Sequence, residues 1–362
     1  MNRRKIRALP HVPKYRQVFE KLLHEILSGK YAPGQKFPSE AALVQQFGTS
    51  RITVGRALRE LSQRGLVERV AGSGTYVGRG HVSADSLLFG LLIPDLGTSE
   101  IFEPICQGIA AAPTASRHGL LWGHVAAGEA APEEQALGLC DQFIASNVAG
   151  VFFAPLERGA AARETNSIVV SRLEEARIPI VLLDRSVAPY PHRSRHDLVG
   201  IDNRLAAYLA AEYLAQQGAG QISFLAYSGG ASTIEARIAG FRESCERGVV
   251  YRVDEMTAAS VGPSLKSFRP GDGFVCANDR TAGEFMKVVL ALGYRVPAHL
   301  RIVGIDDVEY ASLLPVPLTT VRQPCREIGE AAMETMLSRI ANPNRVGRDV
   351  LVECRLVVRE SA

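Results

Sequence analysis

The 362-residue sequence predicts an α/β protein in two parts, a small helical head with a β-hairpin and a larger two-lobed body with doubly wound parallel sheets. Three observations support this prediction. Three amphipathic helical patterns and two short β runs fill the first eighty residues. Continuous apolar strands alternate with helical stretches in the remainder. The charge is divided in the same way, because residues 1–80 carry 15 Lys and Arg against 5 Asp and Glu, and residues 81–362 carry 26 against 33. A basic head points to a polyanionic partner.

The head begins with a helix predicted over residues 15–27, where apolar side chains recur at i, i+3, i+4 and i+7. A Pro-Gly turn separates it from a second helix, which Ser39 caps and Gly48 ends. Ser50 caps a third helix whose apolar residues face inward. We expect Tyr15 to belong to the core with the other apolar residues of the first helix.

Two β runs, residues 66–70 and 75–77, follow the third helix and are joined by a glycine-rich tight turn. Three helices followed by a hairpin form a winged helix-turn-helix, in which the third helix enters the DNA major groove with its first residues against base edges. An arginine there can bind a guanine with two hydrogen bonds, hydroxyls suit phosphates or bases, and a small wing tip can approach the minor groove. The candidate contacts on this basis are Ser50, Arg51, Thr53, Gly72, Ser73, Gly74 and Thr75.

The run FPSEAALVQQFGTSRITVGRALRELSQRGLVERVAGSGTYV, residues 37–77, resembles the DNA-binding domain of the GntR family. The resemblance implies binding to operator DNA, and it adds Ser39 of the PSE block to the candidate contacts. Arg56 is a further candidate, as a substitute for an arginine that the family usually has one residue earlier. Ala41 and Gly55 stand where the family usually has DNA-contacting arginines, so the family's operator sequence does not transfer to this chain. A solvated helix face is the simpler interpretation of the arginines, but the charge division, hairpin glycines and motif order favour DNA.

The predicted domains are the head at residues 1–78, a flexible tether at 79–86 and the body at 87–362. The body is too long for one doubly wound sheet, so two lobes are expected, the first at about 87–190 and 324–350 and the second at about 191–323 and 351–362. We expect helices at 101–118, 132–146 and 167–176, and strands at 87–93, 120–125, 151–154, 180–183, 198–201, 221–225, 273–276 and 301–305.

Polar residues follow five of these strands, beginning with Asp95 and continuing with Asp184-Arg185, Asp202-Asn203, Asn278-Asp279 and Asp306-Asp307. Any one of them alone is more simply a helix N-cap. Together they predict a cleft at the carboxyl ends of the strands, lined with groups that suit a neutral polyhydroxylated ligand. Phe102, Trp122 and Tyr227 are candidate stacking aromatics, although each is more often a core residue.

The body resembles the effector domain of the LacI family, which shares its fold with periplasmic sugar-binding proteins. The segments that carry the resemblance are IPIVLLDR (178–185), VGIDNRLAAYLAAEYLAQQG (199–218), EARIAGF (235–241), VCANDRTA (275–282), RIVGIDD (301–307) and LTTVRQP (318–324). It implies effector contacts at Asp184, Arg237, Asn278, Asp306 and Gln323, with Phe102 near the mouth. A structural ion pair with Glu235 or Asp202 is the alternative for Arg237. The stretch 241–274 departs from the family in being short and irregular.

The combination of the two parts resembles the chimeric arabinose-repressor type of regulator. It implies a homodimeric repressor that binds operator double-stranded DNA and is controlled by a small-molecule effector, a sugar, which releases the DNA. A sugar-binding protein without a DNA role and a sugar-processing enzyme are the alternatives. An enzyme would need a base or nucleophile in the cleft, and the histidines near the lobe crossover, His192 and His196, lie in a loop-like stretch.

Several site classes have no support in the sequence. It contains no paired CxxC cysteines, no HExxH metal motif, no phosphate-binding GxxxxGK[ST] loop and no GxSxG nucleophile elbow. No apolar window of about 18 residues occurs without charge, and the basic N-terminus has no apolar segment behind it. We therefore expect no metal, no cofactor, no membrane association and a cytoplasmic location with reduced thiols.

Overall fold

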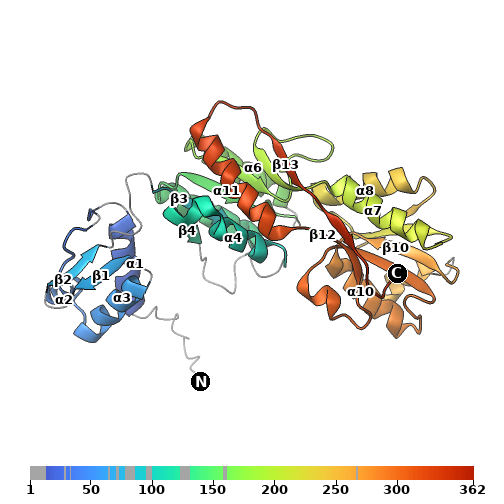
Figure 1. Ribbon diagram of the computed structural model, residues 1–362, viewed down its shortest axis with the longest axis horizontal. Helices are drawn as coiled ribbons and strands as arrows, with labels where there is room; N and C mark the ends of the chain where they lie inside the picture. The colour runs from blue at the N-terminus through green and yellow to red at the C-terminus, as the bar shows by residue number, and fades with distance from the viewer. Residues whose placement is uncertain are drawn as a thin grey trace, which may run out of the picture. The chain divides into compact units, whose positions relative to one another are not determined.

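The computed structural model describes residues 14–27, 30–32, 34–63, 66–70, 73–77, 86–94, 100–122, 131–157, 161–265 and 268–362 (Figure 1). The chain divides into two compact units, residues 1–87 and 88–362. The tether predicted over residues 79–86 lies, apart from Ser86, outside the described residues.

The first unit has the expected order of three helices and a hairpin, with α1 (Lys14–Leu27), α2 (Glu40–Phe47), α3 (Arg51–Gln63), β1 (Val67–Val70) and β2 (Gly74–Val77). The caps are those that the sequence predicts. Ser39 Oγ accepts a hydrogen bond from the amide of Ala42, and Gly48 ends α2 with a φ of 56°, a left-handed conformation that glycine adopts without strain. The hairpin strands are antiparallel, with Val67 opposite Val77. Apolar faces of all three helices and the hairpin form one core.

The second unit contains two six-stranded sheets. The first sheet has the order β13-β7-β6-β5-β3-β4 and the second the order β14-β12-β11-β10-β8-β9. Every neighbouring pair is parallel except β12 and β14. The strands are β3 (Leu88–Leu92), β4 (Gly119–Trp122), β5 (Gly150–Phe153), β6 (Ile180–Leu183), β7 (Asp197–Ile201), β8 (Ile222–Tyr227), β9 (Val249–Val253), β10 (Asp272–Cys276), β11 (Leu300–Asp306), β12 (Thr319–Arg322), β13 (Asp349–Val352) and β14 (Arg355–Val357).

Helices link these strands and pack on the sheets, as continuous apolar strands require. The α-helices are α4 (Phe102–Ala111), α5 (Pro132–Ala145), α6 (Ala162–Glu175), α7 (Asn203–Gln216), α8 (Ser232–Ser244), α9 (Ala258–Leu265), α10 (Asp279–Ala291) and α11 (Cys325–Ala341), with two 3₁₀ turns, η1 (Pro113–Arg117) and η2 (Glu309–Ser312). The predicted helix over 101–118 is therefore wrong in its second half. Pro113 has no amide hydrogen to continue α4, and the chain restarts as η1.

The lobe boundary predicted near residue 190 is also wrong. β7 pairs with β6 on one side and β13 on the other, so residues 197–201 belong to the first sheet. The chain first crosses to the second lobe after Ile201. It returns between β12 and α11, and it crosses again between β13 and β14, where the red C-terminal segment of Figure 1 leaves the first lobe.

The stretch 241–274, expected to be irregular, contains the edge strand β9 and the helix α9. The sequence signal of β9 is weak because this strand pairs only with β8 and most of its side chains are exposed or half-buried. An edge strand of this kind lacks the continuous apolar run of a buried parallel strand.

Candidate functional site

The cap residue Ser50 and the first residues of α3 form a largely exposed surface on the head, with polar side chains and the apolar Ile52. Ser50 Oγ accepts a hydrogen bond from the amide of Thr53, and the two hydroxyl oxygens lie 2.9 Å apart. The opposite side of α3 is anchored by buried apolar residues, namely Val54, Ala57, Leu58 and Leu61. The helix therefore presents one face to solvent from a fixed core.

Arg51, the predicted base-reading residue, projects from this face with 83% of its side chain exposed. Its Nε lies 3.2 Å from one carboxylate oxygen of Glu40, while the other oxygen accepts a hydrogen bond from Arg69 Nη2 at 2.6 Å. Glu40 thus holds one arginine from α3 and one from β1 beside each other. Exposed ion pairs of this kind contribute little to stability, so both guanidinium groups can exchange the carboxylate for phosphate or base oxygens. Arg69 is absent from the sequence-based candidates because nothing local relates it to α3.

The other predicted DNA contacts that this part of the structure describes, Arg56 and the wing residues, contact other side chains of the head. The guanidinium of Arg56 lies 3.9 Å from the ring centre of Tyr15, so this arginine is exposed but stacked on α1. Tyr15 is half-buried beneath it rather than a core residue. At the wing, Ser73 Oγ and the Tyr76 hydroxyl lie 2.6 Å apart, and Gly74 has a φ of 127°. Gly72 lies outside the described residues.

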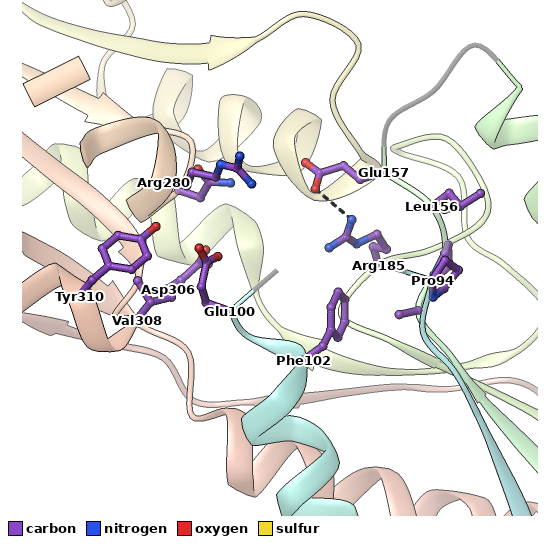
Figure 2. A pocket seen from close by; sticks show the side chains of 13 residues that line it. Pro94, Glu100, Phe102, Leu156, Glu157, Arg185, Arg280, Asp306, Val308 and Tyr310 are labelled. Carbon is purple, nitrogen blue, oxygen red and sulfur yellow. Dashed lines mark hydrogen bonds and ion pairs between the residues drawn. The ribbon is translucent and has the colours of Figure 1, made fainter. Parts of the chain in front are cut away.

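In the body, a cavity of about 160 Å³ lies between the two lobes. Figure 2 shows Phe102, Glu157 and Arg185 entering from the first lobe and Arg280, Asp306 and Tyr310 from the second. Of the predicted effector contacts, Phe102, Asn278 and Asp306 line this cavity, whereas Asp184, Arg237 and Gln323 are buried close to it. Asp95 lies outside the described residues.

Asp306 is the centre of a buried network on the second lobe. Its Oδ1 accepts hydrogen bonds from Gln323 Nε2 at 2.6 Å and Arg237 Nη2 at 3.3 Å. Arg237 also donates to Asn203 Oδ1 and to the carbonyl oxygen of Ala277, and this arrangement excludes the alternative of a pair with Glu235 or Asp202. Burial raises the pKa of Asp306 to about 6, against the opposing effect of the Arg237 charge. Asp306 has a φ of 132°, a strained conformation for a residue with a Cβ.

Arg185 is the centre of a second network, on the first lobe. Its Nε donates to Asp184 Oδ2 at 3.1 Å and its Nη1 donates to Glu157 Oε2 at 3.0 Å. The guanidinium also lies 5.3 Å from the ring centre of Phe102. Arg185 follows the predicted strand 180–183, so the strand-end pattern that singled out Asp184 contained it. Arg280 likewise directly follows the strand-end pair Asn278-Asp279, whereas Glu157 had no such signal and is brought to the cavity by the fold.

Two buried oxygen atoms in these networks have no hydrogen-bond partner among the described residues. They are Asp184 Oδ1 and Gln323 Oε1. Asp184 lines a second cavity of about 230 Å³, and Gln323 lines a third of about 750 Å³, which shares Asp306 with the cavity of about 160 Å³. Both atoms can only accept hydrogen bonds from a ligand unless the carboxylate is protonated. The site therefore favours a ligand with several hydrogen-bond donors.

The remaining strand-end residues have structural roles. Asp202 caps α7 by accepting from two backbone amides. Asp307 is paired with Arg322 and Arg359. Asp279 is fully buried, accepts from Thr320 Oγ1 and the amide of Val308, and has its pKa raised to about 7 by burial. The N-cap interpretation is thus correct for Asp202, and Asn278 both caps α10 and lines the cavity.

Neither Trp122 nor Tyr227 lines the described cavities between the lobes, and the Tyr227 hydroxyl is hydrogen-bonded to Glu284. The adjacent glycines, Gly229 and Gly230, do line a cavity of about 410 Å³ that shares Arg185 with the central one. Of the three candidate aromatics, Phe102 is therefore the one that lines the cavity between the lobes.

Within the described part of the chain, none of the helices is long and apolar enough to cross a membrane. The same residues contain no group of three or more His, Cys, Asp and Glu side chains that could hold a metal ion. His196 lies 2.9 Å from Glu174 outside the cleft, and His192 lines only the 230 Å³ cavity.

Comparisons with known proteins agree with this division into two parts. The model of bacterial regulatory proteins of the gntR family matches residues 14–77, and that of a periplasmic binding protein-like domain matches residues 211–362. The chain is 27% identical over 369 residues to the arabinose metabolism transcriptional repressor of Geobacillus stearothermophilus, an alignment that covers 97% of this chain and 98% of the relative.

Solved structures resemble the body. A LacI family transcriptional regulator from Enterococcus faecium with bound ribose has a TM-score of 0.60 at 20% identity, over 76% of this chain and 98% of that one. The lac repressor dimer bound to operator has a TM-score of 0.60 at 22% identity, over 76% and 94%. These likenesses establish the two-lobed fold predicted from the strand and helix pattern.

Proposed function

We propose that the chain is a transcriptional repressor that joins a GntR-type DNA-binding domain to a periplasmic binding protein-like domain, and that a sugar bound between its lobes controls its affinity for operator DNA. The relatives are transcriptional repressors rather than enzymes, so a sugar-processing enzyme is not supported. A sugar-binding protein without a DNA role would have no use for the gntR-family segment at residues 14–77.

The buried, unpaired acceptors Asp184 Oδ1 and Gln323 Oε1 carry the proposal for the ligand. Leaving a buried acceptor unpaired costs about 1–3 kcal/mol, and a sugar hydroxyl that donates to it recovers this free energy. The arginines in or near the cavity, Arg185, Arg237 and Arg280, already contact carboxylates. An unphosphorylated sugar supplies the missing donors, whereas a phosphate group supplies only acceptors at neutral pH. Arabinose and ribose, which the descriptions of similar proteins mention, are the first candidates.

The proposed DNA contacts are Ser39, Ser50, Arg51, Thr53, Arg56, Arg69 and the wing residues 72–75. The proposed effector contacts are Phe102, Asp184, Arg185, Arg237, Asn278, Asp306 and Gln323, with Asp95 retained from the sequence. Binding at both lobes favours the closed cleft and shifts the conformational equilibrium by the difference in ligand affinity between closed and open states.

We infer a homodimer, because two heads are needed to occupy two half-sites of an operator with twofold symmetry. Lobe closure then alters the spacing of the two heads and lowers operator affinity. A coupling of about 1–3 kcal/mol is typical of such switches and corresponds to a 5- to 150-fold change in affinity.

The test combines two titrations of the full-length protein. Calorimetry with arabinose, ribose and their phosphates should show binding of a free sugar and not of its phosphate. Fluorescence anisotropy with duplex DNA should show affinity that falls steeply with salt and falls further when that sugar is added. A DNA affinity that does not change with salt concentration would contradict the proposal, and so would a sugar that binds without changing the DNA affinity.

A further inference from the structure

Ile52 is 81% exposed although its side chain is entirely apolar. It occupies the first turn of α3, between Arg51 and Thr53. Four apolar residues of the same helix are buried in the core, so Ile52 has no part in holding α3 in place. Single exposed apolar residues are common on protein surfaces, but this one stands at the end of the helix that presents its side chains to DNA.

The surroundings of Ile52 allow a close approach by a flat partner. Gly55 lies one turn further along α3 and has no side chain. Among the described residues outside its own stretch of helix, a Cβ built at Gly55 would meet one heavy atom within about 4 Å, the Glu40 Oε1 at 4.0 Å. The helix surface three residues along from Ile52 therefore has no side chain at Gly55, and it lies next to Glu40, which pairs with Arg51 and Arg69.

We infer that Ile52 reads sequence by contacting the C5-methyl group of a thymine in the major groove. This inference rests on the proposed operator binding by the head. Among the groups that base pairs expose in that groove, the thymine methyl is the apolar one, and apolar side chains distinguish thymine through it. The basic side chains around Ile52 bind phosphates or base acceptors and set the position of α3, while Ile52 supplies the apolar contact.

A second copy of this chain is the other conceivable occupant of an exposed apolar side chain. The neighbouring guanidinium groups of Arg51 and Arg69 favour DNA, because a copy of the same surface would bring like charges together. The apolar contact is also a single side chain, which is too small for a stable protein interface.

The experiment uses the full-length protein and the duplex that it enriches from a randomised DNA library. Each thymine of that duplex is replaced in turn by deoxyuridine, which removes one methyl group and leaves base pairing intact. We expect one thymine in each half-site at which the replacement weakens binding about fourfold, the value of one buried carbon group. Ile52→Ala should weaken binding to the unmodified duplex by at least as much, and it should abolish the penalty at that thymine.

Val346→Ala is the matched control, because Val346 is an equally exposed aliphatic residue (80%) of the body. This variant should keep the full methyl penalty. Ile52→Val, which retains most of the side chain, should keep part of the penalty. Equal binding of Ile52→Ala to the unmodified and the deoxyuridine duplex shows that this variant is still folded. A methyl penalty that persists in Ile52→Ala, or the absence of any such thymine, overturns the inference while leaving operator binding intact. Failure of the full-length protein to enrich any duplex overturns operator binding and this inference with it.

Discussion

The buried network around Asp306 allows a quantitative prediction about the stability of the body. In Asp306→Ala, Arg237 loses its carboxylate and Gln323 Nε2 loses its acceptor. Removing one partner of a buried ion pair leaves an uncompensated charge and typically lowers the free energy of unfolding by about 3–5 kcal/mol. We expect the low end of this range, because Arg237 keeps its hydrogen bonds to Asn203 and Ala277.

A second substitution separates the lost contacts from the backbone strain. Asp306 has a φ of 132°, which glycine adopts freely and alanine does not. Relief of roughly 1–3 kcal/mol of strain is partly offset by the extra freedom of glycine in the unfolded chain. Asp306→Gly should therefore be about 1 kcal/mol more stable than Asp306→Ala, although both lose the carboxylate.

Urea unfolding of the full chain, monitored through a spectroscopic signal from the body, measures the differences in free energy of unfolding between the two variants and the unchanged protein. A loss below about 1 kcal/mol in Asp306→Ala would refute the reasoning, since Arg237 would then have a route to solvent that its 3% exposure does not indicate. An alanine variant as stable as the glycine variant would refute the account of backbone strain. For studies of ligand binding the conservative change Asp306→Asn is preferable, because it keeps an acceptor for both donors.

Three further predictions concern charge, DNA contacts and glycine packing. Asp279 has its pKa raised from 3.8 to about 7, so the folded state binds more protons than the unfolded state between about pH 4 and 7. The stability of the body should therefore fall as the pH rises across this interval. Asp279→Asn should reduce the slope of the urea-midpoint profile, and the raised pKa of Asp306 should account for part of the slope that is left. Arg51→Ala should weaken operator binding by about 1–3 kcal/mol and relax the preference for one base. Arg69→Ala should weaken binding to all duplexes alike and lower the slope of log affinity against log salt by about one. Identical effects of the two variants in binding titrations would contradict the assignment of Arg51 to a base and Arg69 to a phosphate. Gly55→Ala should raise the free energy of unfolding of the head by about 1 kcal/mol, because alanine favours the helix and its Cβ meets only an ordinary contact, Glu40 Oε1 at 4.0 Å. Gly329→Ala should destabilise the body, because its Cβ would overlap the Ile105 carbonyl oxygen. Thermal unfolding of the two variants measures both effects, and the reverse order would count against both.

Local spacing in the sequence was sufficient to predict much of this protein. Several elements depend only on residues that are a few positions apart in the sequence. They are the caps at Ser39 and Gly48, the helices of the head and the strand Ile180–Leu183. Strand-end polar residues also predicted the edge at which the cleft lies, because parallel strands end on the same side of a sheet. Asp306 and Asn278 both line the cavity on this account.

Other features depend on contacts between distant parts of the chain. β7 belongs to the first sheet because β6 and β13 supply its hydrogen-bond partners, and β13 lies about 150 residues away. The pairing of Arg237 with Asp306 and that of Arg69 with Glu40 likewise join residues far apart in sequence. A periodic pattern reports which face of an element is buried but carries no information about which element covers it. Sheet order, ion-pair partners and the two unpaired acceptors of the cleft therefore arise only when distant segments of the chain come together.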